Sequence, residues 1–204
     1  MIGISSGSLK LVALLGGALL FLLSAPSWAD DKKEAGQKKE DTPLTRLDEA
    51  TKVMTADLND NQALQFNAIE TSYRTIRAVE DVQMSVTRAV DACGKKNPDI
   101  KDDMDKRLRE WKDALRPTMK DANNKLDKMI LLQDFSAPSR VRKYLKMFDE
   151  AILYRNQGVE SVPVTEKDQC LKLKDTMSDT QKELVKLLNE TLGLDKPLNT
   201  TEEQ

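Results

Sequence analysis

Two cysteines, Cys93 and Cys170, are the side chains with the clearest potential chemistry in this chain of 204 residues. Cys93 stands one residue before Gly94, and neither thiol has a CxxC neighbour or a histidine to assist it. A redox-active pair or a metal site usually depends on such neighbours. In an exported chain, two isolated cysteines most simply form one disulfide, so we predict a structural Cys93–Cys170 bond.

The chain contains no histidine. Its absence excludes the usual serine and cysteine triads, histidine-ligated haem and most zinc enzymes. Adjacent acids such as Asp102 and Asp103 point in different directions on a helix, so they do not converge on a substrate. We therefore predict no enzyme activity, no catalytic residue, no cofactor and no metal ligand. An enzyme based on carboxylates would need distant acids such as Glu70, Glu110 and Glu150 to meet in one cleft.

The segment DLNDNQALQFNA resembles the start of a calcium-binding loop, with Asp57, Asn59 and Asn61 at its first, third and fifth positions. The pattern then fails, because Gln62 replaces the glycine of the sharp turn and Ala68 replaces the bidentate glutamate. We favour a junction between two helices in which Asn59 or Asp60 is an N-cap.

Methionines could in principle form a soft ligand set for copper(I). They fall instead at the spacing of core positions on separate helices, which favours a role in filling gaps between helices. The residues concerned are Met54, Met104, Met119, Met129 and Met177.

Apolar residues recur at steps of three and four along most of the chain. This spacing predicts that helices carry the side chains discussed above. We predict a first helix over residues 44–58 and a second with an apolar stripe from Phe66 to Cys93, which stops at Gly94. A third carries its stripe from Ile100 to Met129. A shorter helix covers residues 139–156, and the last begins at Thr165.

These helices predict an all-α fold, an up-down-up-down four-helix bundle of long helices with an additional N-terminal helix. In this order, Cys93 and Cys170 lie at the same end of adjacent helices. Pro117 must kink or divide the third helix. If it reversed the chain direction instead, the two cysteines would lie far apart.

The N-terminal region predicts export. Residues 1–29 contain Lys10, a short apolar run and small residues before Ala29, as in a cleavable signal peptide. We predict a disordered charged leader over residues 30–43, a single helical-bundle domain over 44–194 and a disordered tail over 195–204. The periplasm is the preferred compartment and secretion the alternative, with no stable membrane span after cleavage.

The formal charge of −2 favours neither nucleic acid nor an anionic membrane as a partner. We interpret the chain as a non-enzymatic exported protein that binds a protein partner, as a periplasmic adaptor, chaperone-like or envelope factor. Residues 44–58 offer an apolar stripe that could dock on that partner. The alternative is a small-ligand sensor with a pocket near Pro117, lined by Trp111. The sequence predicts neither the partner's identity nor the oligomeric state.

Overall fold

A computed structural model describes residues 40–158 and 163–194, and these residues contain five α-helices, one short 3₁₀-helix and no strand. The all-α prediction is confirmed. The predicted signal peptide (1–29), most of the leader (30–43) and the tail (195–204) lie outside the described residues, as do residues 159–162 between the last two predicted helices.

The first two helices begin at side-chain caps. Helix α1, Pro43–Thr55, has Thr42 as its N-cap and proline at its first position, where the missing N–H costs nothing. Helix α2, Asp60–Lys96, begins at Asn59, which forms a reciprocal capping box with Gln62. Asn61 therefore lies inside a helix, and the segment that resembled a calcium loop is a helix junction.

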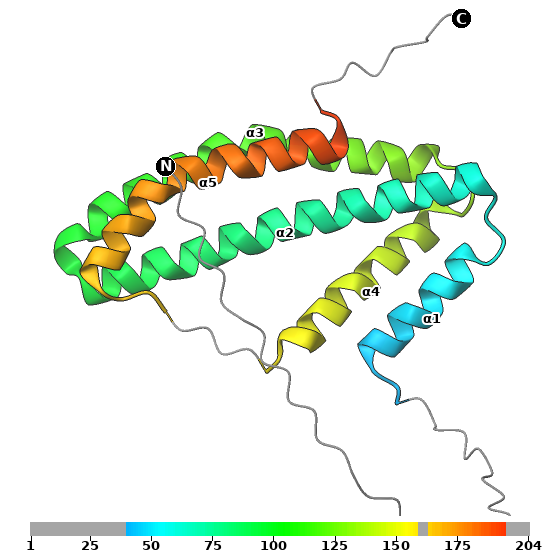
Figure 1. Ribbon diagram of the computed structural model, residues 1–204, viewed down its shortest axis with the longest axis horizontal. Helices are drawn as coiled ribbons and strands as arrows, with labels where there is room; N and C mark the ends of the chain where they lie inside the picture. The colour runs from blue at the N-terminus through cyan, green and yellow to red at the C-terminus, as the bar shows by residue number, and fades with distance from the viewer. Residues whose placement is uncertain (1–39, 159–162, 195–204) are drawn as a thin grey trace, which may run out of the picture. The chain divides into compact units, whose positions relative to one another are not determined.

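The connection between α2 and α3 differs from the prediction that α2 stops at Gly94. The helix continues to Lys96, and a Cβ atom on Gly94 would lie 2.9 Å from Cγ of Lys101. Glycine thus allows the two chain segments to approach closely. A 3₁₀ turn, Pro98–Ile100, then leads directly into α3, Lys101–Leu132. Pro117 lies inside α3 without dividing it, so α3 runs back along α2 (Figure 1).

Helix α4 spans Pro138–Asn156, close to its predicted range, and α5 spans Lys167–Leu192. Helix α5 begins two residues later than expected and lacks a side-chain cap. It ends at Gly193, which adopts a left-handed conformation with φ 58°. Glycine reaches this conformation without strain, and it is the usual residue for this type of helix end.

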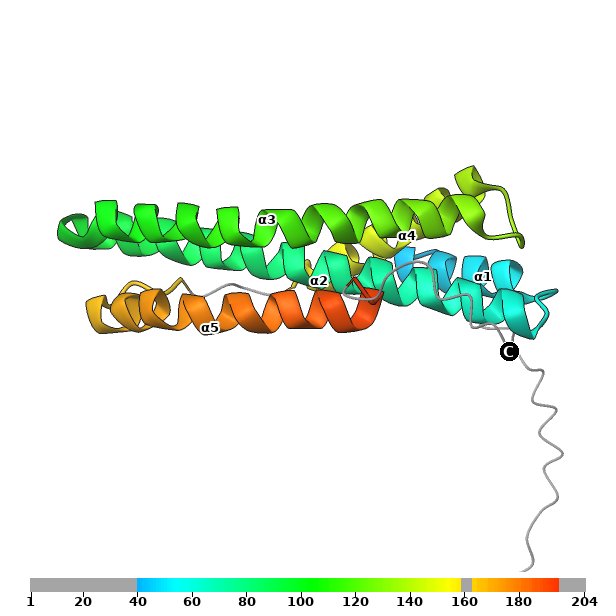
Figure 2. The same ribbon diagram turned by 90° about the horizontal axis from the view of Figure 1, so that it is seen from above.

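The described helices form two groups in space. Helices α2, α3 and α5 pack against one another, while α1 packs mainly against α4 (Figures 1 and 2). The predicted four-helix up-down-up-down arrangement is not confirmed. A physical reason is that α4 ends at Asn156 and is much shorter than α3, along which it would have to return. Helix α4 instead packs mainly against α1, with Tyr144 also contacting Phe66 of α2.

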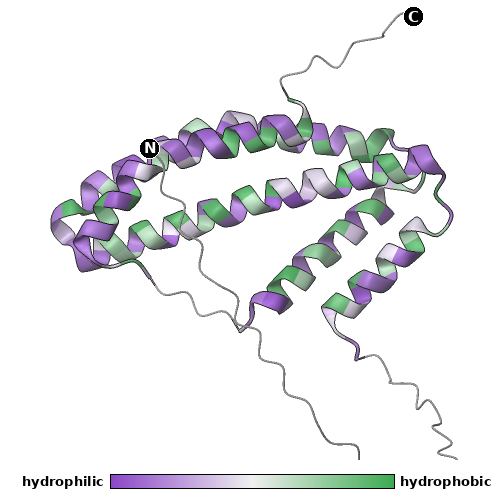
Figure 3. Ribbon diagram, viewed as in Figure 1, coloured by the Kyte–Doolittle hydropathy of each residue, from purple (hydrophilic) through white to green (hydrophobic). Residues whose placement is uncertain are grey.

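A single hydrophobic core connects both groups, with buried side chains contributed by all five α-helices. Hydrophobic and hydrophilic residues alternate along each helix (Figure 3), as expected for helices with one buried face. Within residues 40–158 and 163–194, no helix is both long and apolar enough to cross a membrane.

Candidate functional site

The two cysteines meet in the core. Their sulfur atoms are 2.01 Å apart and their Cα atoms 5.8 Å apart, so the predicted pair is confirmed at disulfide distance. Neither cysteine has any exposed surface. The side chain of Asn97 donates hydrogen bonds to the carbonyl oxygens of Cys93 (3.1 Å) and Thr165 (2.9 Å). This buried link joins the end of α2 to the start of α5, which favours a structural role.

The acids considered for catalysis lie on three different helices. Glu70 contacts Arg74 at 3.5 Å, Glu110 contacts Arg107 at 3.7 Å, and Glu150 is exposed on α4. In the part of the chain that the structure describes, no group of three or more histidine, cysteine or acidic side chains could hold a metal ion.

Trp111 and the methionines belong to the hydrophobic core. Met104 and Met177 are buried on α3 and α5, and Met119 and Met129 pack against the core while partly exposed. Trp111 has no exposed surface and lines none of the three cavities described below. Its burial gives no support to the predicted small-ligand pocket near Pro117.

The α1–α4 pair is attached to the first half of α2 by aromatic and polar contacts. The ring centroids of Tyr144 on α4 and Phe66 on α2 are 5.3 Å apart. The Tyr144 hydroxyl is 3.0 Å from Oγ1 of Thr51 on α1. Further along, the Tyr73 hydroxyl donates a 2.7 Å hydrogen bond to Asp149. Burial, and then this bond, raise the pKa of Tyr73. The apolar stripe predicted over residues 44–58 thus packs mainly inward.

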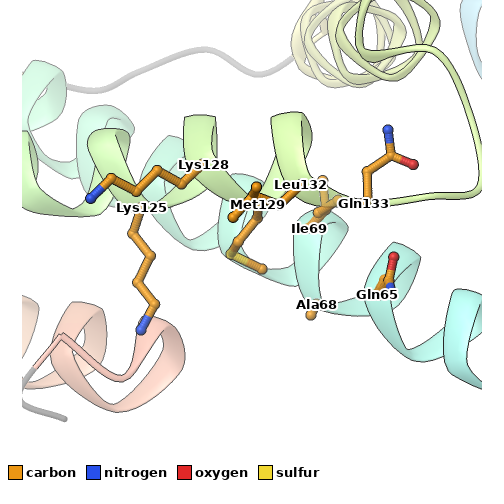
Figure 4. A pocket seen from close by; sticks show the side chains of 8 residues that line it. All are labelled: Gln65, Ala68, Ile69, Lys125, Lys128, Met129, Leu132 and Gln133. Carbon is orange, nitrogen blue, oxygen red and sulfur yellow. The ribbon is translucent and has the colours of Figure 1, made fainter. Parts of the chain in front are cut away.

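The strongest candidate for a binding site is an apolar groove of about 470 Å³ between α2 and α3. We call it the α2–α3 groove (Figure 4). Its lining residues are Gln65, Ala68 and Ile69 from α2, Lys125, Lys128, Met129 and Leu132 from α3, and Gln133 at the C-cap of α3.

The groove exists because α5 is shorter than the helices on which it packs. Helix α5 follows α3 in parallel, with Nζ of Lys167 2.5 Å from the Asp99 carboxylate near its start. At its end, Nζ of Lys125 donates a 2.9 Å hydrogen bond to the carbonyl oxygen of Gly193. Helix α3 continues for about two further turns, from Lys125 to Leu132. The groove is therefore the continuation of the surface that α5 covers.

The spacing of the lining residues matches one face of each helix. The α3 residues fall at positions 125, 128, 129 and 132, and the α2 residues at 65, 68 and 69. Steps of three and four place residues on one side of a helix. Leu132 leaves 82% of its surface exposed, whereas Leu131, also 59% exposed, does not line the groove.

The charges of the groove are all of one sign and lie at one end. Lys125 lies beside the end of α5, Lys128 follows about one turn further along α3, and no acid is among the lining residues. Within the described residues, Lys128 has no ion-pair partner. The end of the groove further from α5 contains Leu132 together with neutral amide side chains. The lining thus combines an apolar floor with a basic end.

Two other cavities are more polar. One of about 340 Å³ lies between α3 and α5, where Asp103 pairs with Lys174 at 2.6 Å and Arg107 bonds Ser178. Because these groups satisfy one another, little charge remains for a ligand. A cavity of about 290 Å³ lies between the α1–α2 turn and the α3–α4 connection, with Arg140 on its wall.

Sequence reasoning missed the α2–α3 groove, although one signal is present. Gly193 is a typical helix stop, and it limits α5 to a shorter path than α3. The apolar pattern identifies Met129 as a core position, yet its packing partner cannot be assigned without the relative alignment of α3 and α5. The two lysines carry no distinguishing pattern of their own.

The chain matches no protein-family model, no curated protein and no solved structure. A proposal about its function therefore depends on its own geometry, and the α2–α3 groove is the feature that offers a surface of definite shape and charge.

Proposed function

We propose that this protein is a non-enzymatic exported protein that binds other proteins, as a periplasmic adaptor, chaperone-like or envelope factor. Its binding surface is the α2–α3 groove, and the occupant is an amphipathic helical segment of the partner. The open groove beyond the end of α5 is the single observation that carries this proposal (Figure 4).

The shape of the groove supports a helical occupant. Helix α5 already packs on the same two helices, and its buried residues Leu184, Leu188 and Leu192 follow one another at steps of four. A partner helix with apolar residues at similar steps would continue this packing past Gly193. Docking of an amphipathic helix into an apolar groove is a recurrent mode of recognition. The volume of about 470 Å³ lies within the usual range of binding cavities, roughly 300–1,000 Å³.

Leu132→Glu tests the proposal most cleanly, because Leu132 is highly exposed and lines the groove. Its neighbour Leu131 provides a matched control, Leu131→Glu, on an exposed residue that does not line the groove. Exposed substitutions of this kind change the free energy of unfolding by about 0.5 kcal/mol or less. We expect proteins captured from the native envelope by the wild type to be retained by Leu131→Glu and lost with Leu132→Glu.

Val53→Glu adds a test of the docking surface predicted on residues 44–58. Val53 is 73% exposed on α1, so the substitution adds a charge to the exposed side of this helix, next to the apolar stripe, without disturbing the core. We expect Val53→Glu to retain the captured proteins. Loss of the same proteins with Val53→Glu, or their retention with Leu132→Glu, would contradict binding through the groove.

A further inference from the structure

The distribution of charge in the α2–α3 groove restricts which helix can occupy it. This inference rests on the proposed function and concerns the chemistry of the partner. Lys125 and Lys128 both lie at the end of the groove that adjoins α5, and the lining contains no acid to balance them. The ammonium group of Lys125 points toward the end of α5 (Figure 4), where it donates a hydrogen bond to the carbonyl oxygen of Gly193. Lys128 has no ion-pair partner in the described part of the chain.

We propose that the groove selects an amphipathic helix with acidic residues in its first turn, and that this first turn lies beside Lys125 and Lys128. The apolar face of the helix then covers Met129 and Leu132 further along the groove. The partner helix continues the path of α5 and runs in the same direction.

The lysines favour negative charge at this end of the occupant, and acidic side chains supply a full negative charge where a helix terminus supplies only a partial one. Acidic side chains stabilise a helix when they stand in its first turn and destabilise it in its last turn, because the N-terminus carries a partial positive charge. An occupant with acids beside the lysines is therefore most stable when its N-terminus lies at that end.

The end of α5 favours the same direction. The carbonyl groups of its last turn give this terminus a partial negative charge. Lys125 compensates the carbonyl group of Gly193. A second helix that begins beside α5 brings its positive end to the negative end of α5. The opposite direction would bring two negative ends together.

Synthetic peptides can test this selection without knowledge of the natural partner. We would use three capped peptides of about 15 residues, long enough to form helix, with leucines three and four residues apart. They differ in the first turn, which contains glutamates, lysines or glutamines. A fourth peptide carries the glutamates in its last turn. Fluorescence anisotropy with the full chain gives the dissociation constant of each.

We expect the peptide with glutamates in its first turn to bind about fivefold more tightly than the glutamine peptide, and the lysine peptide to bind most weakly. Lys128→Glu should reverse the order of the glutamate and lysine peptides. Comparing each peptide on the wild type and on Lys128→Glu cancels differences in the helicity of the free peptides. High salt should reduce these differences, since the lysines are exposed to solvent.

Equal binding of all four peptides, lost in Leu132→Glu, would overturn the selection for acids while leaving the proposed function intact. If the wild type bound the two glutamate peptides equally, and Lys128→Glu changed the dissociation constants of both to the same extent, the proposed direction of the bound helix would be wrong. Failure of every peptide to bind would contradict the proposed function together with this inference. If the peptides bound only to a shortened protein that ends at Leu194, the inference would be overturned. Residues 195–204 would then be the occupant of the groove in the full chain.

Discussion

The two ends of the α2–α3 hairpin are covered by different parts of the chain. At the end that contains Cys93, α5 packs on both helices and a pair of sulfur atoms at disulfide distance joins it to α2. At the opposite end α5 is absent. There, the α1–α4 pair packs through aromatic rings and hydrogen bonds, and the α2–α3 groove stays open.

Under the proposed function, a short final helix divides one scaffold into a covalently linked region and a region with an open apolar groove. The same two helices run through both ends, so the difference arises from what covers them. A covalent link at one end can hold the bundle together while the other end leaves apolar surface available. Substitutions at each end can therefore test the two regions separately.

The largest effect is expected at the cysteine-linked end. The Cys93→Ala/Cys170→Ala double variant should lose about 4 kcal/mol of unfolding free energy, because the link closes a long loop that otherwise adds entropy to the unfolded chain. The two cysteines have a sequence separation of 77. Urea unfolding of the wild type and the variant measures this loss. Alkylation of both thiols in native protein without reductant would contradict the bond itself.

A smaller and more local effect is expected in the α1–α4 pair. Tyr144→Ala removes a buried ring that contacts Phe66 and Phe148, and should cost about 3 kcal/mol. Hydrogen exchange should accelerate mainly in α1 and α4. The control Tyr144→Phe keeps the ring and removes the hydroxyl beside Thr51, at a cost of about 1 kcal/mol. Equal acceleration in α5 would show that the two regions unfold as one unit.

The smallest effect concerns the hydrogen bond between Tyr73 and Asp149. Tyr73→Phe should cost about 1 kcal/mol at neutral pH. The folded protein raises the pKa of Tyr73, so it binds the phenolic proton more tightly than the unfolded chain does. This contribution is complete below about pH 10, the ordinary pKa of tyrosine, and is lost as pH rises toward the raised pKa. Unfolding curves of both proteins across this range should therefore converge, and a constant difference would contradict the assignment.

The sequence predicts the local features of the fold better than its assembly. Apolar periodicity locates the five α-helices of the described residues, and the presence of only two cysteines predicts that they pair. Local rules place Asn59 at a helix start, because a cap depends on residues close in the chain. They fail at Gly94, which lies inside α2 and whose missing side chain leaves room for Lys101.

The assembly depends on lengths and alignments that the pattern of a single helix does not encode. Periodicity gives α4 an apolar face but does not say whether that face meets α5 or α1. The α2–α3 groove was missed for the same reason, since it depends on where Gly193 falls along α3.

The most direct test of a binding surface on α2 and α3 is methyl NMR of the full chain during addition of the peptide with glutamates in its first turn. We predict the largest shifts at the methyl groups of Met129 and Leu132, with Met54 in the α1–α4 pair unchanged. Shifts concentrated at Met54, Val53 or Leu153 would contradict the account, because they would place the peptide on the α1–α4 pair.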